Sequence, residues 1–239
     1  MQTELAGLLR ARCPQQFWQA IMIVALLVFI TNVSRGFADP QLIRCLMVLG
    51  YLLTLSAFAV GDSAVIGTTA SVSRASDSLR STVRKYLPAD ALLLALHGLV
   101  IVSLAFLCFG DSLAYIIFYA ILTGANVIWL SVKLSQFCEL TRDPGLPPVH
   151  RARVWECIGA MHRWMAINGV FLIMNCLLLT LKSSGRVDAN VVDLSLAGLG
   201  VLRSVVDMAV CYEFYSRSLA GEFDPTRIAA AERSQSTAP

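Results

Sequence analysis

Six long apolar stretches, almost free of charged residues, occupy most of this 239-residue chain. Each stretch approaches the ~20 residues that an α-helix needs to cross about 30 Å of hydrocarbon. A helix in a soluble domain keeps a polar face toward water, so charges would interrupt such a stretch every turn or two. The pattern therefore predicts an all-α, polytopic membrane bundle of about six transmembrane helices. The predicted helices cover approximately Phe17–Val33, Arg44–Ile66, Ala91–Phe109, Leu113–Val132, Trp164–Leu181 and Leu194–Tyr215.

The segments between these stretches predict that the helices form three hairpins. Short segments that contain Gly, Pro or Asp, residues that favour chain reversal, are expected to close each hairpin. They lie at residues 35–40, 110–111 and about 182–193. Longer basic segments, at about residues 68–88 and 136–164, are expected to join one hairpin to the next.

We expect the first long connection to continue the second helix out of the membrane, because Ser71–Tyr86 contains neither Gly nor Pro. Pro88 is then expected to end this helix, and Asp90 to supply an acidic start for the third span. The second connection contains three prolines and a glycine within residues 143–148, which cannot be helical throughout. A new amphipathic stretch is expected to begin near Arg151.

The predicted domain organisation is one transmembrane domain followed by a short tail. Residues 1–225 form the domain, and residues 226–239 are polar and expected to be disordered. A cleaved signal peptide is an alternative for the first helix, because Gly36 and Ala38 place small residues at the −3 and −1 positions of a possible cleavage site. Cleavage there would leave five spans.

Charged residues make up 15% of the chain, against about 25% in a typical soluble protein. Their distribution predicts an orientation with both termini cytoplasmic, in the cell (inner) membrane, because Lys and Arg gather on the cytoplasmic side of membrane proteins. The side of the amino terminus receives Arg10, Arg12, Arg74, Arg80, Arg84, Lys85, Lys133, Arg142, Arg151, Arg153, Arg163, Arg217, Arg227 and Arg233. The other side receives Arg35, Arg44, Lys182 and Arg186, and Arg203 lies within the sixth span. Orientation and anionic lipid headgroups account for these charges, so nucleic-acid binding is not expected.

Placing a polar group inside hydrocarbon costs free energy, so the polar residues within the predicted spans are the candidates for function. Arg203 and Asp207 lie four residues apart in the sixth span, so their side chains share a face and can pair. The pair could act as a gate or ion-coupling element. It could equally fix the rotation of the helix or hold a partner subunit.

Asp62 is the second intramembrane candidate. Its own helix offers no opposite charge nearby, so its carboxyl must find a partner on another helix, reach water or bind a proton. Asp62 is therefore either a cation or proton site, or a hydrogen-bonded packing residue. A ridge of small residues at four-residue spacing beside it predicts close helix packing and a homo-oligomer or other membrane subunits as partners. The ridge consists of Ala59, Ser63, Gly67, Ser71 and Ala75.

The remaining intramembrane candidates are one histidine and three asparagines. His97 stands alone in the third span, where hydrogen bonding between helices is the more common role. Asn126, Asn168 and Asn175 could join helices by hydrogen bonds, and Asn168 and Asn175 share a face that could also line a polar path.

Signatures of catalysis and of cofactor binding are absent from the sequence. The seven cysteines form no CxxC pair and no cluster with histidine, and no HExxH motif or phosphate-binding loop occurs. We therefore expect no catalytic residue, no metal and no cofactor. An interfacial enzyme remains a third hypothesis, because five acidic or histidine residues gather around the second long connection. They are Glu139, Asp143, His150, Glu156 and His162.

Two functional hypotheses lead. The chain is a small transport or permeation unit whose intramembrane polar residues converge on one cavity, or it is a non-catalytic subunit or assembly factor of a larger membrane complex. The direction of Asp62 and Asp207 separates the two hypotheses. If both side chains line a shared interior pocket, transport is favoured, whereas an outward orientation of both favours assembly.

Overall fold

The computed structural model describes residues 17–33 and 42–219, the last five of them as backbone only. Within these ranges all regular structure is helical, in six helices. The predicted all-α membrane bundle is therefore confirmed. The helices are Phe17–Val33, α2 (Leu42–Val72), α3 (Asp77–Leu107), α4 (Ser112–Thr141), α5 (Pro148–Ser183) and α6 (Ala189–Leu219).

Among the described residues, the five helices α2 to α6 are long and apolar enough to cross a membrane. The helix Phe17–Val33 is apolar but shorter. At a rise of 1.5 Å per residue it is about 25 Å long, which is close to the lower limit for a membrane span.

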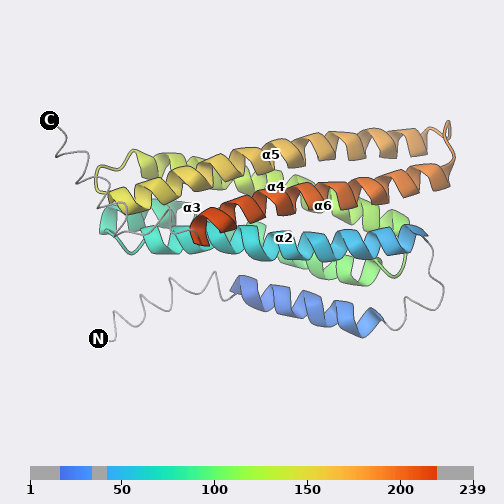
Figure 1. The fold of residues 1–239 in the computed structure, drawn as a ribbon, viewed down its shortest axis with the longest axis horizontal. Coiled ribbons are helices and arrows are strands. Elements are labelled where there is room, and N and C mark those ends of the chain that lie inside the picture. Colours follow the sequence, from blue (N-terminus) through green and yellow to red (C-terminus); the bar gives the residue numbers. More distant parts are fainter. Residues whose placement is uncertain (1–16, 34–41, 220–239) are drawn as a thin grey trace.

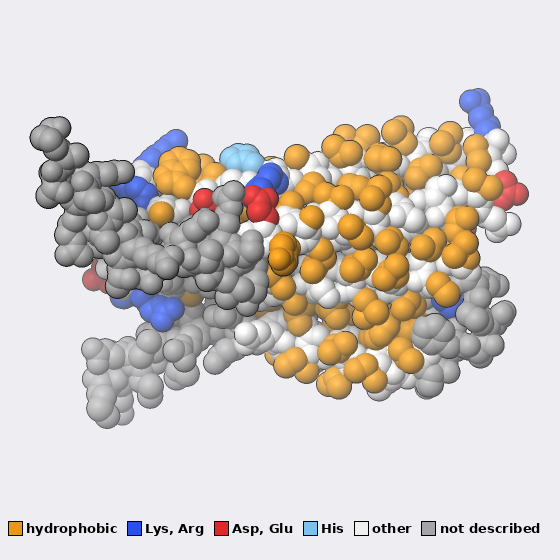
Figure 2. All heavy atoms as spheres, viewed as in Figure 1, with side chains coloured by type: hydrophobic (Ala, Val, Ile, Leu, Met, Phe, Trp, Pro, Cys, Tyr) orange, Lys and Arg blue, Asp and Glu red, His pale blue; other side chains and the backbone are white. Residues whose placement is uncertain are grey.

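The helices run along the long axis of one elongated bundle (Figure 1). The α2–α3 and α4–α5 connections lie at one end, which we call the basic end, and the α3–α4 and α5–α6 turns lie at the opposite end. Figure 2 shows hydrophobic side chains covering the middle of the visible face, with charged side chains toward the ends. The basic end carries Arg74, Arg80, Arg84, Lys85, Arg142, Arg151, Arg153 and Arg163, whereas the opposite end carries Arg44, Lys182 and Arg186.

Neighbouring helices close into a ring through the order α3, α4, α5, α6 and α2. Helices α2 and α3 contact each other little, and Phe17–Val33 packs against both. The ring of Phe29 stacks on Tyr51 of α2 with centroids 5.3 Å apart, and Trp18 Nε1 donates to the carbonyl oxygen of Phe58 at 3.4 Å. On α3, Ile21 lies against Gly98. The first helix thus completes the wall of the bundle between α2 and α3.

The expectation of a continuous helix from Ser71 to Tyr86 is wrong. Helix α2 ends at Val72, and α3 begins at Asp77 after a tight turn. The Ser76 side chain caps α3 by accepting a hydrogen bond from Leu79 N at 3.2 Å, which satisfies one of the amide groups that a helix start leaves without a partner. The cap at Ser76 therefore starts a new helix here, although the segment contains neither Gly nor Pro.

Pro88 does not end a helix, contrary to the prediction, because α3 continues through it to Leu107. Proline removes one backbone hydrogen bond from a helix, but packing against a neighbour can hold the helix on both sides. Here α3 is tied to α4 by Lys85 with Glu139 before the proline, and by Asp90 with Lys133 after it.

The break predicted within residues 143–148 is confirmed, since α4 ends at Thr141 and α5 begins at Pro148. The possible cleavage site at Gly36 and Ala38, and the tail at 226–239, lie outside the described residues and stay predictions.

Candidate functional site

One face of α4 carries polar side chains along the interior of the bundle. Tyr115, Tyr119, Thr123, Asn126, Lys133 and Gln136 are all buried, and each follows the previous one by three, four or seven residues. This spacing keeps side chains on a single helix face. We call this face, together with the polar groups that contact it from other helices, the polar column.

The central part of the polar column contains a small cavity of about 20 Å³. Asp62 of α2, Asn126 of α4 and Asp207 of α6 contribute its polar lining, and Trp164 and Cys211 are among the other lining residues. The three polar side chains are 4–7% exposed. Within the part of the chain that the structure describes, each has an oxygen atom without a hydrogen-bond donor: Oδ2 of Asp62, Oδ1 of Asn126 and Oδ1 of Asp207. A cavity of this size has room for about one water molecule or a comparably small cation.

The predicted Arg203–Asp207 pair is present and borders this cavity. Nη2 of Arg203 lies 2.9 Å from Oδ2 of Asp207, and both side chains are nearly inaccessible. Nη1 of Arg203 also donates to Thr123 Oγ1 at 3.4 Å, and the guanidinium lies 5.1 Å from the centre of the Tyr119 ring. The pair therefore faces the interior of the bundle, where α4 contacts it.

A second buried ion pair joins Lys133 of α4 to Asp90 of α3. Lys133 also donates to Oε1 of Gln136 at 3.0 Å. The apolar pattern predicted Lys133 among the basic residues of the cytoplasmic side and Asp90 at a helix start, and both predictions are wrong. Asp90 lies well inside α3 because the helix continues through Pro88. The spacing of seven residues between Asn126 and Lys133 was the sequence signal that could have placed Lys133 on the interior face.

Toward the opposite end, hydroxyl groups extend the polar column. Oγ1 of Thr54 and Oγ of Ser204 lie 2.7 Å apart, and the Tyr119 hydroxyl donates to the carbonyl oxygen of Gly200 at 2.9 Å. Asn175 and Tyr115 line a second cavity of about 10 Å³ beside Tyr119. Asn175 is thus a member of the column.

His97 and Asn168 are buried but bond chiefly to their own helices. His97 Nδ1 lies 2.8 Å from the carbonyl oxygen of Leu93, and its ring packs near Phe58 and Trp129. Asn168 donates to the carbonyl oxygen of Trp164 at 2.7 Å. Neither residue lines one of the two cavities.

The charges inside the bundle do not balance. Among the described residues, the buried charged side chains are Asp62, Asp90 and Asp207 against Lys133 and Arg203. Two ion pairs use one aspartate each, and Asp62 forms no ion pair with any described residue. Asp62 nevertheless lies within electrostatic reach of Lys133, Arg203 and Asp207. It is the acidic group in excess.

The small-residue ridge lies near the surface of the bundle. Ala59, Ser63, Gly67 and Ser71 are partly exposed on α2, whereas Ala75 is exposed in the turn after the end of α2 at Val72, so it does not continue the helical ridge. A side-chain carbon placed on Gly67 would meet no atom within 4 Å. The ridge as a contact with other chains stays a prediction.

The acidic and histidine residues of the second connection do not assemble into one site. Glu139 accepts hydrogen bonds from Lys85 and from the Tyr86 hydroxyl, so it ties α4 to α3. Asp143 accepts from Ser78 Oγ at 2.6 Å and from Gly145 N at 2.8 Å, and these donors lower the pKa of its carboxyl below the usual range. Within the described parts of the chain, no three His, Cys, Asp or Glu side chains group as metal ligands.

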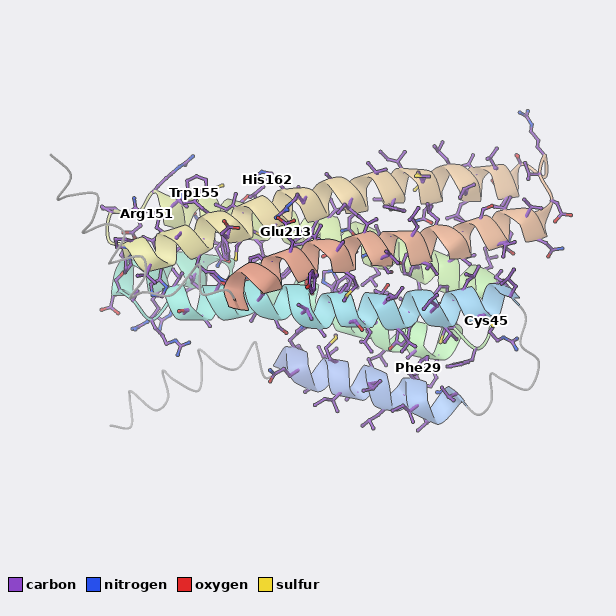
Figure 3. The ribbon with its side chains drawn as sticks, in the orientation of Figure 1. Phe29, Cys45, Arg151, Trp155, His162 and Glu213 are labelled. Carbon is purple, nitrogen blue, oxygen red and sulfur yellow. The ribbon has the colours of Figure 1, made fainter. Side chains whose placement is uncertain are left out.

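The outer surface of α5 near the basic end presents aromatic and basic side chains. Figure 3 shows Arg151, Trp155 and His162 along this part of the helix, with Glu213 of α6 beside it. Trp155 is 56% exposed, and Arg163 pairs with Glu213 across the two helices. Exposed tryptophan next to arginine is typical of a membrane–water interface.

Comparison of the chain with known protein families, with curated proteins and with solved structures gives no match. The site is therefore interpreted from its own geometry and chemistry.

Proposed function

We propose that this membrane protein is a small transport or permeation unit that moves a small cation, with the cavity at Asp62, Asn126 and Asp207 as its intramembrane site. The observation that supports the proposal is that these three side chains, from three different helices, line one cavity and each carries an oxygen atom without a donor among the described residues. Oxygen atoms are the ligands of hard cations, and a carboxylate oxygen also binds a proton. Ionisable groups inside a membrane bundle are costly, and function is the usual reason for keeping them.

The polar column supports the same proposal. It continues from the Lys133–Asp90 pair past the cavity to the hydroxyl groups of Tyr119, Thr54 and Ser204. A purely structural bundle would gain as much from apolar packing, since buried ion pairs add little net stability. The small cavity volume favours a cargo no larger than a hydrated proton or a bare ion.

We also propose that both termini face the cytoplasm. The basic end gathers most of the surface Lys and Arg of the described residues, and Phe17–Val33 starts and α6 finishes toward that end (Figure 1). The positive-inside rule assigns such an end to the cytoplasm.

Flux measurements on the purified chain in sealed proteoliposomes test the function. With an imposed membrane potential, we expect wild-type protein to move protons or Na⁺ above the rate in protein-free vesicles, as reported by internal dyes. Asp62→Asn should abolish this flux, and Asp193→Asn, which alters a carboxylate paired with Lys182 near the opposite end, should retain it. Wild-type vesicles as tight as protein-free ones to both ions would overturn the proposal.

A subunit of a larger complex is the second candidate, and the exposure of the small-residue ridge on α2 favours it. Such a surface lets another helix approach closely in lipid. Purification in a mild detergent with Gly67→Leu as the variant distinguishes this candidate. A partner that accompanies the wild type and is lost from the variant would support it.

A further inference from the structure

We propose that Asp62 is a proton-binding site, whose carboxylate takes up one proton from water and returns it to water. This inference rests on the proposed function and specifies the cation at that site. Uptake forms one O–H bond on a carboxylate oxygen and breaks one O–H bond of a hydronium ion, which becomes water. Release reverses both changes.

The contacts of Asp62 support a neutral carboxyl group. The residue is 7% exposed, and Oδ2 receives no hydrogen bond from residues 17–33 or 42–219. Moving an isolated carboxylate from water into a low-dielectric interior is very costly, and binding a proton removes that cost. The two buried basic groups, Lys133 and Arg203, already pair with Asp90 and Asp207.

The groups facing Asp62 come from each helix around the cavity. Helix α6 presents Asp207, already paired with Arg203, and the thiol of Cys211. Helix α4 presents Asn126, and Lys133, which is held by Asp90 of α3. Helix α5 presents the Trp164 ring.

A second carboxylate at the cavity disfavours a further negative charge on Asp62. With both ion pairs intact, an ionised Asp62 leaves one negative charge in the interior, and one added positive charge neutralises it.

The geometry favours a proton over a metal cation. Ca²⁺ and Mg²⁺ take about six or more oxygen ligands, whereas only three of the side chains that line this cavity carry an oxygen atom without a donor among the described residues. A divalent ion would also exceed the single charge that the interior lacks. A proton needs one oxygen atom and no coordination shell.

Infrared difference spectroscopy of the full-length protein in lipid bilayers at pH 7 tests the proposal. We expect a carbonyl stretching band of a protonated carboxyl group, absent from Asp62→Asn and retained in the matched control Asp193→Asn. If Asp62→Asn fails to fold, Asp62→Glu serves instead, and the band should shift in frequency. A wild-type spectrum without the band, or a band unchanged by the Asp62 substitution, would overturn the assignment.

Titration with NaCl separates a proton from a metal cation. The band should be insensitive to NaCl, and its loss on addition of Na⁺ would overturn the proton in favour of a sodium site. The outcomes also separate the two proposals. A band without ion flux removes transport but keeps the proton site, whereas flux without the band keeps transport and removes the proton site.

Discussion

The buried charged residues have different partners, and the partner of each determines its role. Lys133 and Arg203 are almost completely inaccessible and each contacts one aspartate. Asp62 is the acidic residue left over, and it lines the same cavity as Asp207. Removing one member of a buried pair leaves its partner as an uncompensated charge, which costs far more than the intact pair contributes.

This difference predicts the effect of Lys133→Ala. We expect the free energy of unfolding to fall by about 3–5 kcal/mol, because the Asp90 carboxylate loses its countercharge inside the bundle. Lys85→Ala is the matched control, since Lys85 pairs with Glu139 at the surface and its side chain is 64% exposed. Equilibrium unfolding in mixed micelles measures both, and Lys85→Ala should have little effect.

The double variant Lys133→Met with Asp90→Leu completes the test. Replacing a buried pair by apolar side chains of similar size is often close to neutral. We expect the double variant to recover most of the loss. Equal stability of Lys133→Ala and Lys85→Ala would show that the buried pair is not formed.

At the scale of helices, the first helix, Phe17–Val33, packs differently from the others. It fills the gap between α2 and α3 and is held by Trp18, by Phe29 and by the close contact of Ile21 with Gly98. A side-chain carbon at Gly98 would lie 2.6 Å from Ile21 Cδ1, so only a glycine allows this approach without a shift.

The contact predicts the effect of Gly98→Leu. Overpacking of this kind typically costs about 1–3 kcal/mol, so we expect a loss of stability in that range. Adding Ile21→Ala to the same chain should restore part of it, because the smaller side chain makes room for leucine. Gly169→Leu on α5 is the control, since no atom lies within 4 Å of a side-chain carbon there. Equal losses at the two glycines would contradict the packing of the first helix.

The sequence predicted most helices, but the tertiary contacts decided their ends. Hydrophobic length alone predicts the spans, because hydrocarbon thickness is fixed. Pro88 misled the prediction, since the ties of α3 to α4 on both sides of the proline are long-range contacts. The pairing of α2 with α6, which brings Asp62 to Asp207, also has no local sequence signal.

The candidate site was partly predictable from the sequence. Asp62, Asn126, Arg203 and Asp207 stood out because each is polar within an apolar stretch. Lys133 and Asp90 were misplaced because both lie near the ends of such stretches, where a charge is usually solvated. Only their meeting across α3 and α4 shows that they are interior residues.

For the whole molecule, the proposed transport function requires that water reach the polar column inside an otherwise apolar bundle. The direct measurement is the exchange of S–H for S–D in D2O at single cysteines in membranes, followed by the infrared S–H stretching band, because exchange needs no reagent larger than water. Native Cys211 and Asn126→Cys probe the cavity, each as the sole cysteine of the chain. Ile128→Cys is the control, since Ile128 is 57% exposed on the apolar outside of the same helix.

A thiol hydrogen exchanges only where water reaches it, so we expect exchange at positions 126 and 211 to be clearly faster than at position 128. Complete protection of both cavity positions, equal to that of the lipid-facing control, would contradict the account.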